Sequence, residues 1–250
     1  MDDIQREIER MQKLVDVIRQ EIELAVMFHE TWRPSACDTD LHMRIGASYA
    51  GHAFLIIRLS LRRELLLALN RVWDTHRKSV RMGLIADRLR SKEFFDALVQ
   101  YRAQRSHLKS DSAHKAIKTA LVLKRDQVLA LISKYSEGGN AARVLEKLTK
   151  VRHEHLAHRQ LPNEPAAIDR PNPHGVRAEA IDLATVDEIE AFYQDNLQLV
   201  SLLLSLVQGH AYDLSETAGI YKHHANFFWA SARGERTEGH PDFRAPPPDI

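Results

Sequence analysis

Apolar residues recur at steps of three or four along the N-terminal part of the chain. The repeat consists of Ile4, Ile8, Met11, Val15, Ile18, Ile22 and Val26. This spacing places the side chains on one face of a helix, so it predicts a long amphipathic helix over residues 2–32. Pro34 follows the repeat and disfavours the helical turn around it, which predicts that the helix ends before this residue.

The next apolar segment, residues 41–73, is hydrophobic around much of a helical circumference. Its apolar residues include Phe54, Leu55, Ile56, Ile57, Leu65, Leu66 and Leu67. A helix that is apolar on all sides is typical of a buried element. We therefore expect this segment to form the central buried helix of a bundle.

Helical periodicity continues through most of the remaining chain. The expected helices cover residues 79–90, 92–105, 112–135, 141–160, 185–212 and 215–230. Ser110-Asp111-Ser112 offers capping oxygens, Gly138-Gly139-Asn140 breaks the chain, and residues 161–175 carry four prolines in an expected loop. The pattern predicts an all-α fold with a long N-terminal helix and a C-terminal helical extension. One domain is expected over residues 1–230, followed by a flexible, Pro-containing tail over residues 231–250.

Composition narrows the class of protein. The chain has 250 residues and one cysteine, Cys37, so it forms no internal disulfide. Its longest strongly apolar stretch, 197–207, is much shorter than the roughly 20 residues that span a bilayer. The acidic start, Met1-Asp2-Asp3, does not resemble a signal peptide. We expect a cytoplasmic protein with no membrane partner.

Charge is strongly segregated along the chain although the whole carries only +1. Residues 1–57 carry a net charge of −4, residues 58–159 carry +13 and residues 160–250 carry −8. A basic middle third between acidic ends indicates either a polyanionic partner or strong contacts between the segments. Solvated helix faces are the simpler alternative.

The common catalytic signatures are absent from the sequence. It contains no Gly-rich phosphate loop, no Gly-x-Ser-x-Gly, no Cys-x-x-Cys and no His-Glu-x-x-His. Cys37 lies in a turn-like stretch with no local base, so no nucleophile is assigned there. No cofactor is predicted.

A dense cluster of histidine and arginine lies near the end of the expected helix 141–160. It reads Lys150-Val151-Arg152-His153-Glu154-His155-Leu156-Ala157-His158-Arg159-Gln160. Arginine presents a rigid fork of donors to a phosphate, and histidine exchanges a proton near neutral pH, so the cluster suits phosphodiester chemistry. Arg152 and His158 lie about 240° apart on a regular helix, so their cooperation requires a loosened helix end or a second chain.

Two other interpretations of this cluster remain open. Cations are favoured in the last turn of any helix by the helix dipole, whatever the function. A metal site made of His153, His155 and His158 is also conceivable, but no cysteine or well-spaced carboxylate completes it. No metal site is therefore predicted.

The stretch Arg152-His153-Glu154-His155-Leu156-Ala157-His158 resembles the signature of HEPN domains, in which an arginine and a polar residue precede a histidine by a few positions. Together with the segment Leu61-Arg62-Arg63-Glu64-Leu65-Leu66-Leu67-Ala68-Leu69-Asn70-Arg71-Val72-Trp73-Asp74, it is similar to the HEPN branch named after the AbiU abortive phage infection proteins. The similarity covers roughly residues 5–210. Histidine stands where this branch more often has asparagine or aspartate, and His155 is an additional imidazole.

The resemblance implies a HEPN-like helical bundle that forms a homodimer with a shared cleft and cleaves RNA without a metal. It implies that His158 is the general base toward a ribose 2′-hydroxyl and that Arg152 stabilises the charge on the phosphorane. His153 would orient one of these residues or act as the acid. We assign Lys150, His155 and Arg159 to RNA binding. The expected partners are RNA, either tRNA or mRNA, and an antitoxin. The expected role is in phage defence or in a toxin–antitoxin system.

Two other classes of function remain as alternatives. The first is a non-catalytic HEPN-like module that binds RNA, a nucleotide or a partner protein. The second is an oligomeric scaffold assembled through Ile8, Val15 and Ile22 on the N-terminal helix. The acidic C-terminal block is also a candidate for covering the basic middle third within one chain.

Overall fold

The computed structural model describes residues 3–74, 81–106, 110–151, 184–235, 237–241 and 243–244. Over these residues the fold is all-α, as predicted, and the one strand-like pairing within them is an isolated bridge between Trp73 and Arg81. The helices are α1 (Asp3–Cys37), α2 (Thr39–Ile45), α3 (Ala50–Arg71), α4 (Met82–Arg90), α5 (Lys92–Arg105), α6 (Asp111–Tyr135), α7 (Ala142–Val151), α8 (Val186–Leu203), the π-helix η2 (Leu204–Gln208) and α9 (Leu214–Ser231).

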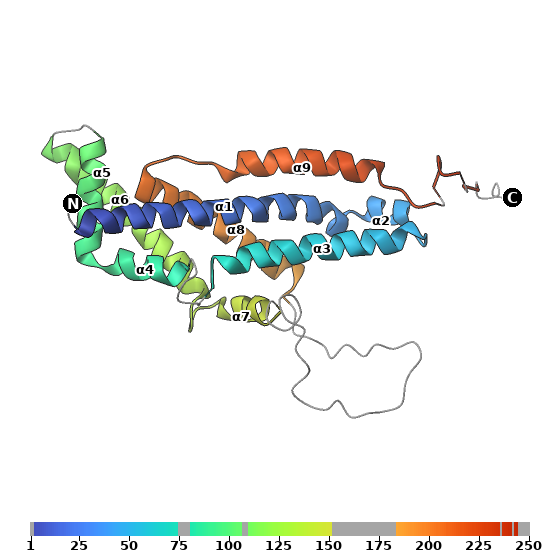
Figure 1. Ribbon diagram of the computed structural model, residues 1–250, viewed down its shortest axis with the longest axis horizontal. Coiled ribbons are helices and arrows are strands. Elements are labelled where there is room, and N and C mark those ends of the chain that lie inside the picture. The colour runs from blue at the N-terminus through green and yellow to red at the C-terminus, as the bar shows by residue number, and fades with distance from the viewer. Residues whose placement is uncertain are drawn as a thin grey trace, which may run out of the picture.

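Helix α1 is the axis of the molecule. Helices α3 and α9 flank it along the long axis, while α4, α5 and α6 gather around its N-terminal end (Figure 1). Helix α8 packs against α1 and α6, and α7 packs against α3, α6 and α8. The predicted apolar stripe of α1 is confirmed, because Ile8, Val15 and Ile22 are fully buried in the main core. These three side chains are therefore not free to mediate assembly, which removes the basis of the scaffold alternative.

Helix α1 continues through Pro34, so the predicted end before this residue is wrong. Proline cannot donate to the carbonyl of Glu30, which costs one helical hydrogen bond. The neighbouring residues Trp32 and Ser35 are buried, and the Asp38 amide donates to the Pro34 carbonyl at 2.9 Å. Packing on both sides of Pro34 thus outweighs the lost hydrogen bond.

The segment 41–73 is not one buried helix. It is broken at Gly46, whose φ of 52° ends α2, and it resumes as α3. The C-terminal half of α3 is buried through Leu65, Leu66 and Leu69, but its N-terminal half exposes large apolar side chains. Among these, Ile56 is 65% and Leu59 is 63% exposed.

Most other predicted boundaries lie close to the observed ones. Helix α5 matches its predicted limits, and the Ser110 hydroxyl caps α6 by accepting from the Ala113 amide. Helix α4 begins at Met82 rather than at residue 79, because Arg81 is extended. The predicted helix 185–212 ends early, since α8 passes into η2 and the chain leaves the helical conformation at Gly209.

Ion pairs connect the basic middle third to both acidic ends. Arg71 and Arg88 pair with Glu21 and Glu7 of α1 at 2.8 and 2.9 Å. On the other side, Lys134 pairs with Asp195 at 2.5 Å and Lys147 with Glu188 at 3.2 Å. Part of the opposite charge of the three segments is therefore paired within the chain. No helix among the described residues is long and apolar enough to cross a membrane.

Candidate functional site

The structure describes one of the six predicted site residues. Lys150 is exposed on α7, whose described residues run to Val151. The other five, Arg152, His153, His155, His158 and Arg159, lie outside the described residues, so their roles stay predictions. The expected loop over 161–175 lies outside them as well.

The end of α7 is fixed to α3 immediately before Arg152 in the sequence. Leu148 is fully buried in the core, and the Thr149 hydroxyl donates to the side-chain oxygen of Asn70 at 3.3 Å. Asn70 is itself 2% exposed and donates to the Leu66 carbonyl at 2.8 Å. Because a buried amide with both ends bonded has one orientation, Asn70 holds Thr149 at a defined position.

The start of α8 is attached to the same side of the molecule. Arg62 of α3 donates to the Ala184 carbonyl at 3.3 Å, and Thr185 and Glu188 form a reciprocal capping box. The ion pair of Lys147 with Glu188 then joins α7 to α8 directly. Residues 151 and 184, which flank the predicted catalytic segment, are thus both anchored beside α3.

A cavity of about 880 Å³ adjoins the end of α7. Its lining comes from the end of α3, the start of α4, the end of α6 and one face of α7, and includes Thr149 and Lys150. Its described charged residues are Asp74, Arg81, Asp87, Glu137, Glu146 and Lys150. Among these described residues, acidic groups outnumber basic ones.

The floor of this cavity is held by aromatic and ionic contacts. Trp73 packs against Tyr135 and donates to Asn196 at 2.8 Å, while Lys134 and Tyr135 both donate to Asp195. Burial, and then the hydrogen bond to Asp195, raise the pKa of Tyr135 above its ordinary value. The Tyr135 hydroxyl therefore stays protonated and acts as a structural donor.

A buried polar network behind this region was not predicted from the sequence. His29 of α1 is 1% exposed, and its ring nitrogens lie 2.8 Å from Glu30 and 2.9 Å from Glu190 of α8. The ring stacks on Tyr193, whose hydroxyl donates to Glu30. The His29 ring therefore bridges a carboxyl group on α1 and one on α8, and the network joins the two helices.

A family model described as AbiU2, a branch of the HEPN domains, matches residues 8–228 and so nearly the whole described fold. The chain belongs to the AbiU2 family. This confirms the resemblance found in the sequence. Comparison with curated proteins and with solved structures gave no match.

The segment 61–74, which carries part of the AbiU2 resemblance, contributes to the core of this domain. Leu65, Leu69 and Val72 are fully buried, and Asn70 and Trp73 line or support the cavity at α7. This segment thus contains the part of α3 against which the end of α7 packs.

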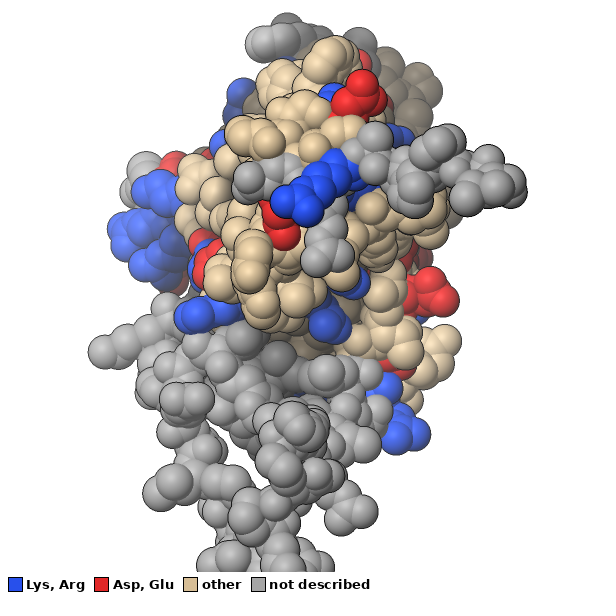
Figure 2. Space-filling view, turned by 90° about the vertical axis from the view of Figure 1, so that its right-hand side faces the viewer, with Lys and Arg blue, Asp and Glu red and all other residues tan. Residues whose placement is uncertain are grey.

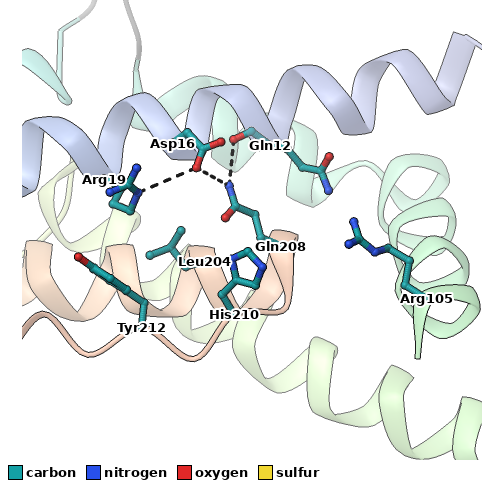
Figure 3. Close-up of a pocket in the computed structure, with 8 residues that line it drawn as sticks. All are labelled: Gln12, Asp16, Arg19, Arg105, Leu204, Gln208, His210 and Tyr212. Carbon is teal, nitrogen blue, oxygen red and sulfur yellow. Dashed lines mark hydrogen bonds and ion pairs between the residues drawn. The ribbon is translucent and has the colours of Figure 1, made fainter. Parts of the chain in front are cut away.

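The AbiU2 domain has a second pocket, of about 470 Å³, where η2 meets α1 (Figure 3). Gln208 donates to the Gln12 carbonyl and to Asp16, His210 lies beside Gln208, and Arg105 lines the pocket from α5. Arg19, also at this pocket, is already paired with Glu23 at 2.7 Å. The hydrogen bonds of Gln208 thus connect η2 to α1 at this pocket.

Candidate metal ligands were also sought among the described residues. They contain no group of three or more histidine, cysteine, aspartate or glutamate side chains that could hold a metal ion. The alternative site of His153, His155 and His158 lies outside them.

Proposed function

We propose that this AbiU2 protein is an endoribonuclease of the HEPN type that acts in phage defence or in a toxin–antitoxin system. The observation that carries the proposal is the family match over residues 8–228, together with the Arg152–His158 spacing inside that range. The structure supports it indirectly, because α7 and α8 anchor both flanks of the segment that holds these two residues. We further propose that RNA, with tRNA and mRNA as candidates, is the substrate.

The proposed reaction is an internal transesterification of RNA. His158 takes the proton of a ribose 2′-hydroxyl, the 2′-oxygen attacks the adjacent phosphorus, and the bond to the 5′-oxygen breaks. A second protonated group, with His153 as a candidate, gives the departing 5′-oxygen its proton. Arg152 stabilises the negative charge that builds on the phosphorane oxygens. The products are a 2′,3′-cyclic phosphate and a 5′-hydroxyl, and the scheme uses no metal.

We propose that the active form is a homodimer with one shared cleft. The described residues that flank the motif, at the end of α7 and before α8, contact α3 through Asn70 and Arg62, so we place the dimer surface on α3. Its N-terminal half exposes the apolar side chains of Leu55, Ile56 and Leu59, which is unusual for a monomer. An apolar stripe on a helix is well suited to pack against its own copy around a twofold axis.

The deciding experiment compares wild-type protein with His158→Ala on total RNA and on tRNA, with EDTA present. We expect fragments ending in 2′,3′-cyclic phosphate from the wild type alone. Cleavage by both proteins would indicate a contaminating nuclease or a different catalytic residue. Absence of cleavage by both, with RNA still bound and with affinity lost in Arg152→Ala, would instead establish the non-catalytic binding module.

A further inference from the structure

Basic side chains of α5 and α6 gather around η2. Arg102 donates to the carbonyls of Ser205 and Leu206 at 2.9 and 3.3 Å, and Lys124 donates to the Ser205 hydroxyl. Within the described part of the chain, neither of these two basic side chains forms an ion pair. Burial, and then the positive charge of Arg105, lower the pKa of Arg102 from its ordinary value. The surroundings of η2 thus carry positive charge that no described carboxylate pairs with directly.

This charge lies next to the pocket of about 470 Å³ between α1 and η2 (Figure 3). A Cβ built at Gly209 would clash with the Arg102 guanidinium, so this group abuts the chain between Gln208 and His210. Both of these neighbours line the pocket. The described lining includes no residue of α3 and none of the cavity beside α7, so the pocket is separate from the proposed dimer surface and from that cavity.

Two donors in the lining are available to an anion. Arg105 is exposed, and its guanidinium donates to the Tyr101 hydroxyl at 2.9 Å but pairs with no carboxylate among the described residues. The His210 side chain is exposed as well and has no hydrogen-bond partner there. Asp16, the carboxylate of this lining, already accepts from Gln208 at 2.9 Å. The negative charge of the pocket is therefore engaged, whereas part of its positive charge is accessible.

The two glutamines at the pocket offer free acceptors. Gln208 uses its side-chain nitrogen for the Gln12 carbonyl and for Asp16, and Gln12 uses its own for the Tyr101 hydroxyl at 3.3 Å. Within the described chain, the side-chain oxygen of each glutamine makes no hydrogen bond. An amide oxygen only accepts, so these two atoms suit hydroxyl groups of a ligand. Leu204 is the one aliphatic residue in the described lining, which favours a hydroxylated ligand over an apolar one.

We propose that this pocket binds a sugar phosphate. The phosphate is held by Arg105 and His210, with Arg102 behind them, and the sugar hydroxyls donate to the side-chain oxygens of Gln12 and Gln208. A phosphate monoester carries about −1.5 to −2 charge at pH 7, so it compensates the basic groups around η2 better than a single carboxylate does. The volume of about 470 Å³ lies in the range of small-molecule sites. This inference does not depend on the proposed ribonuclease activity.

The test is isothermal titration calorimetry of the full chain with ribose 5-phosphate, glucose 6-phosphate, glucose and inorganic phosphate. We expect at least one sugar phosphate to bind roughly tenfold or more tightly than inorganic phosphate, and glucose alone to give no heat of binding. Arg105→Gln/His210→Gln should raise the Kd for that sugar phosphate by roughly tenfold or more, because hydrogen bonds to a charged phosphate are lost. Both side chains are exposed, so we expect circular dichroism to show an unchanged fold.

Arg10→Gln is the matched control, because Arg10 is exposed on α1 and is not part of the pocket lining. It removes the same charge from the same region and should leave the Kd unchanged. If the double variant itself does not fold, His210→Gln alone serves, since the described structure gives this side chain no contact to lose.

Absence of binding of both sugar phosphates, or binding that the pocket variants leave unchanged, would overturn the proposal. Equal affinities for the sugar phosphates and inorganic phosphate would overturn the role of the glutamine oxygens and with it the choice of a sugar. Tighter binding of adenosine 5′-monophosphate than of ribose 5-phosphate would also overturn it, because the pocket would then recognise a base.

Discussion

His29 shows how much a single buried side chain can organise in this fold. Its ring is hydrogen-bonded to a carboxyl group on each side, Glu30 from its own helix and Glu190 from α8, and Arg33 also pairs with Glu190 at 2.7 Å. Removing one member of such a cluster leaves a buried charge without its partner, which is more costly than never having built the pair. The cluster therefore makes the pairing of α1 with α8 specific.

We expect Glu190→Gln to destabilise the protein in a pH-dependent manner. Burial acts to raise the pKa of Glu190, but hydrogen bonds from Gln194 and His29 outweigh it and lower the pKa below its ordinary value. A lowered carboxyl pKa contributes stability that is present above the unfolded pKa of about 4.3 and is lost as the pH falls through the folded value. Urea unfolding at pH 7 should show a loss of about 1–2 kcal/mol, and the difference from wild type should shrink below pH 5.

Glu93→Gln is the control for this experiment, because Glu93 is exposed at the start of α5 and remote from His29. Its free energy of unfolding should stay close to that of the wild type at every pH. A constant difference between Glu190→Gln and wild type from pH 7 to pH 4 would show that charge at Glu190 is not what stabilises the cluster.

At the scale of elements, local sequence patterns predicted most helices but not the features that depend on distant residues. The α1 stripe and the cap of α6 are local signals, and each was found where expected. The π-helix was missed because its support comes from α5, where Arg102 donates to the carbonyls of Ser205 and Leu206. The catalytic residues were proposed from spacing and resemblance alone, whereas the Asn70–Thr149 contact that positions α7 has no local signature.

Gly209→Ala should destabilise the C-terminal end of η2 by roughly 1–3 kcal/mol. Gly209 has a φ of 85°, and a Cβ built there would lie 2.4 Å from the Arg102 guanidinium, which would have to leave the carbonyls that it caps. Gly219→Ala is the matched control, because its Cβ would meet nothing within 4 Å inside α9 and should stabilise the helix by about 0.5–1 kcal/mol. Thermal unfolding of both variants tests this, and an equal effect of the two substitutions would contradict it.

At the scale of the whole molecule, the opposite charges are partly paired within the chain, whereas large apolar side chains remain exposed on its surface. Ion pairs within the chain neutralise part of the charge contrast between the basic middle and the acidic ends, but among the described residues Arg58 and Arg62 have no acidic partner. Seen end-on, most of the described surface belongs to residues other than lysine, arginine, aspartate and glutamate (Figure 2). Large apolar side chains on α3 and α9 are exposed. The prediction of a fully buried α3 is therefore wrong for its N-terminal half, which no described part of the chain covers.

We expect Ile56→Glu/Leu59→Glu to convert the proposed homodimer into a folded monomer. Both side chains are more than 60% exposed, so the substitution removes little packing within the chain, while two charges at a twofold interface would repel their copies. Light scattering coupled to size exclusion should show the mass of one chain, with unchanged helicity by circular dichroism and loss of RNA cleavage.

Two controls make this dimer prediction specific. Phe227→Glu, on the exposed face of α9, should leave the dimer intact, because the proposed interface is formed by α3. Val15→Asp should unfold the protein rather than dissociate it, because Val15 is fully buried in the core. A wild type that is monomeric at the concentration at which it cleaves RNA would show that one chain completes the site, and the apolar stripe of α3 would then require a different partner.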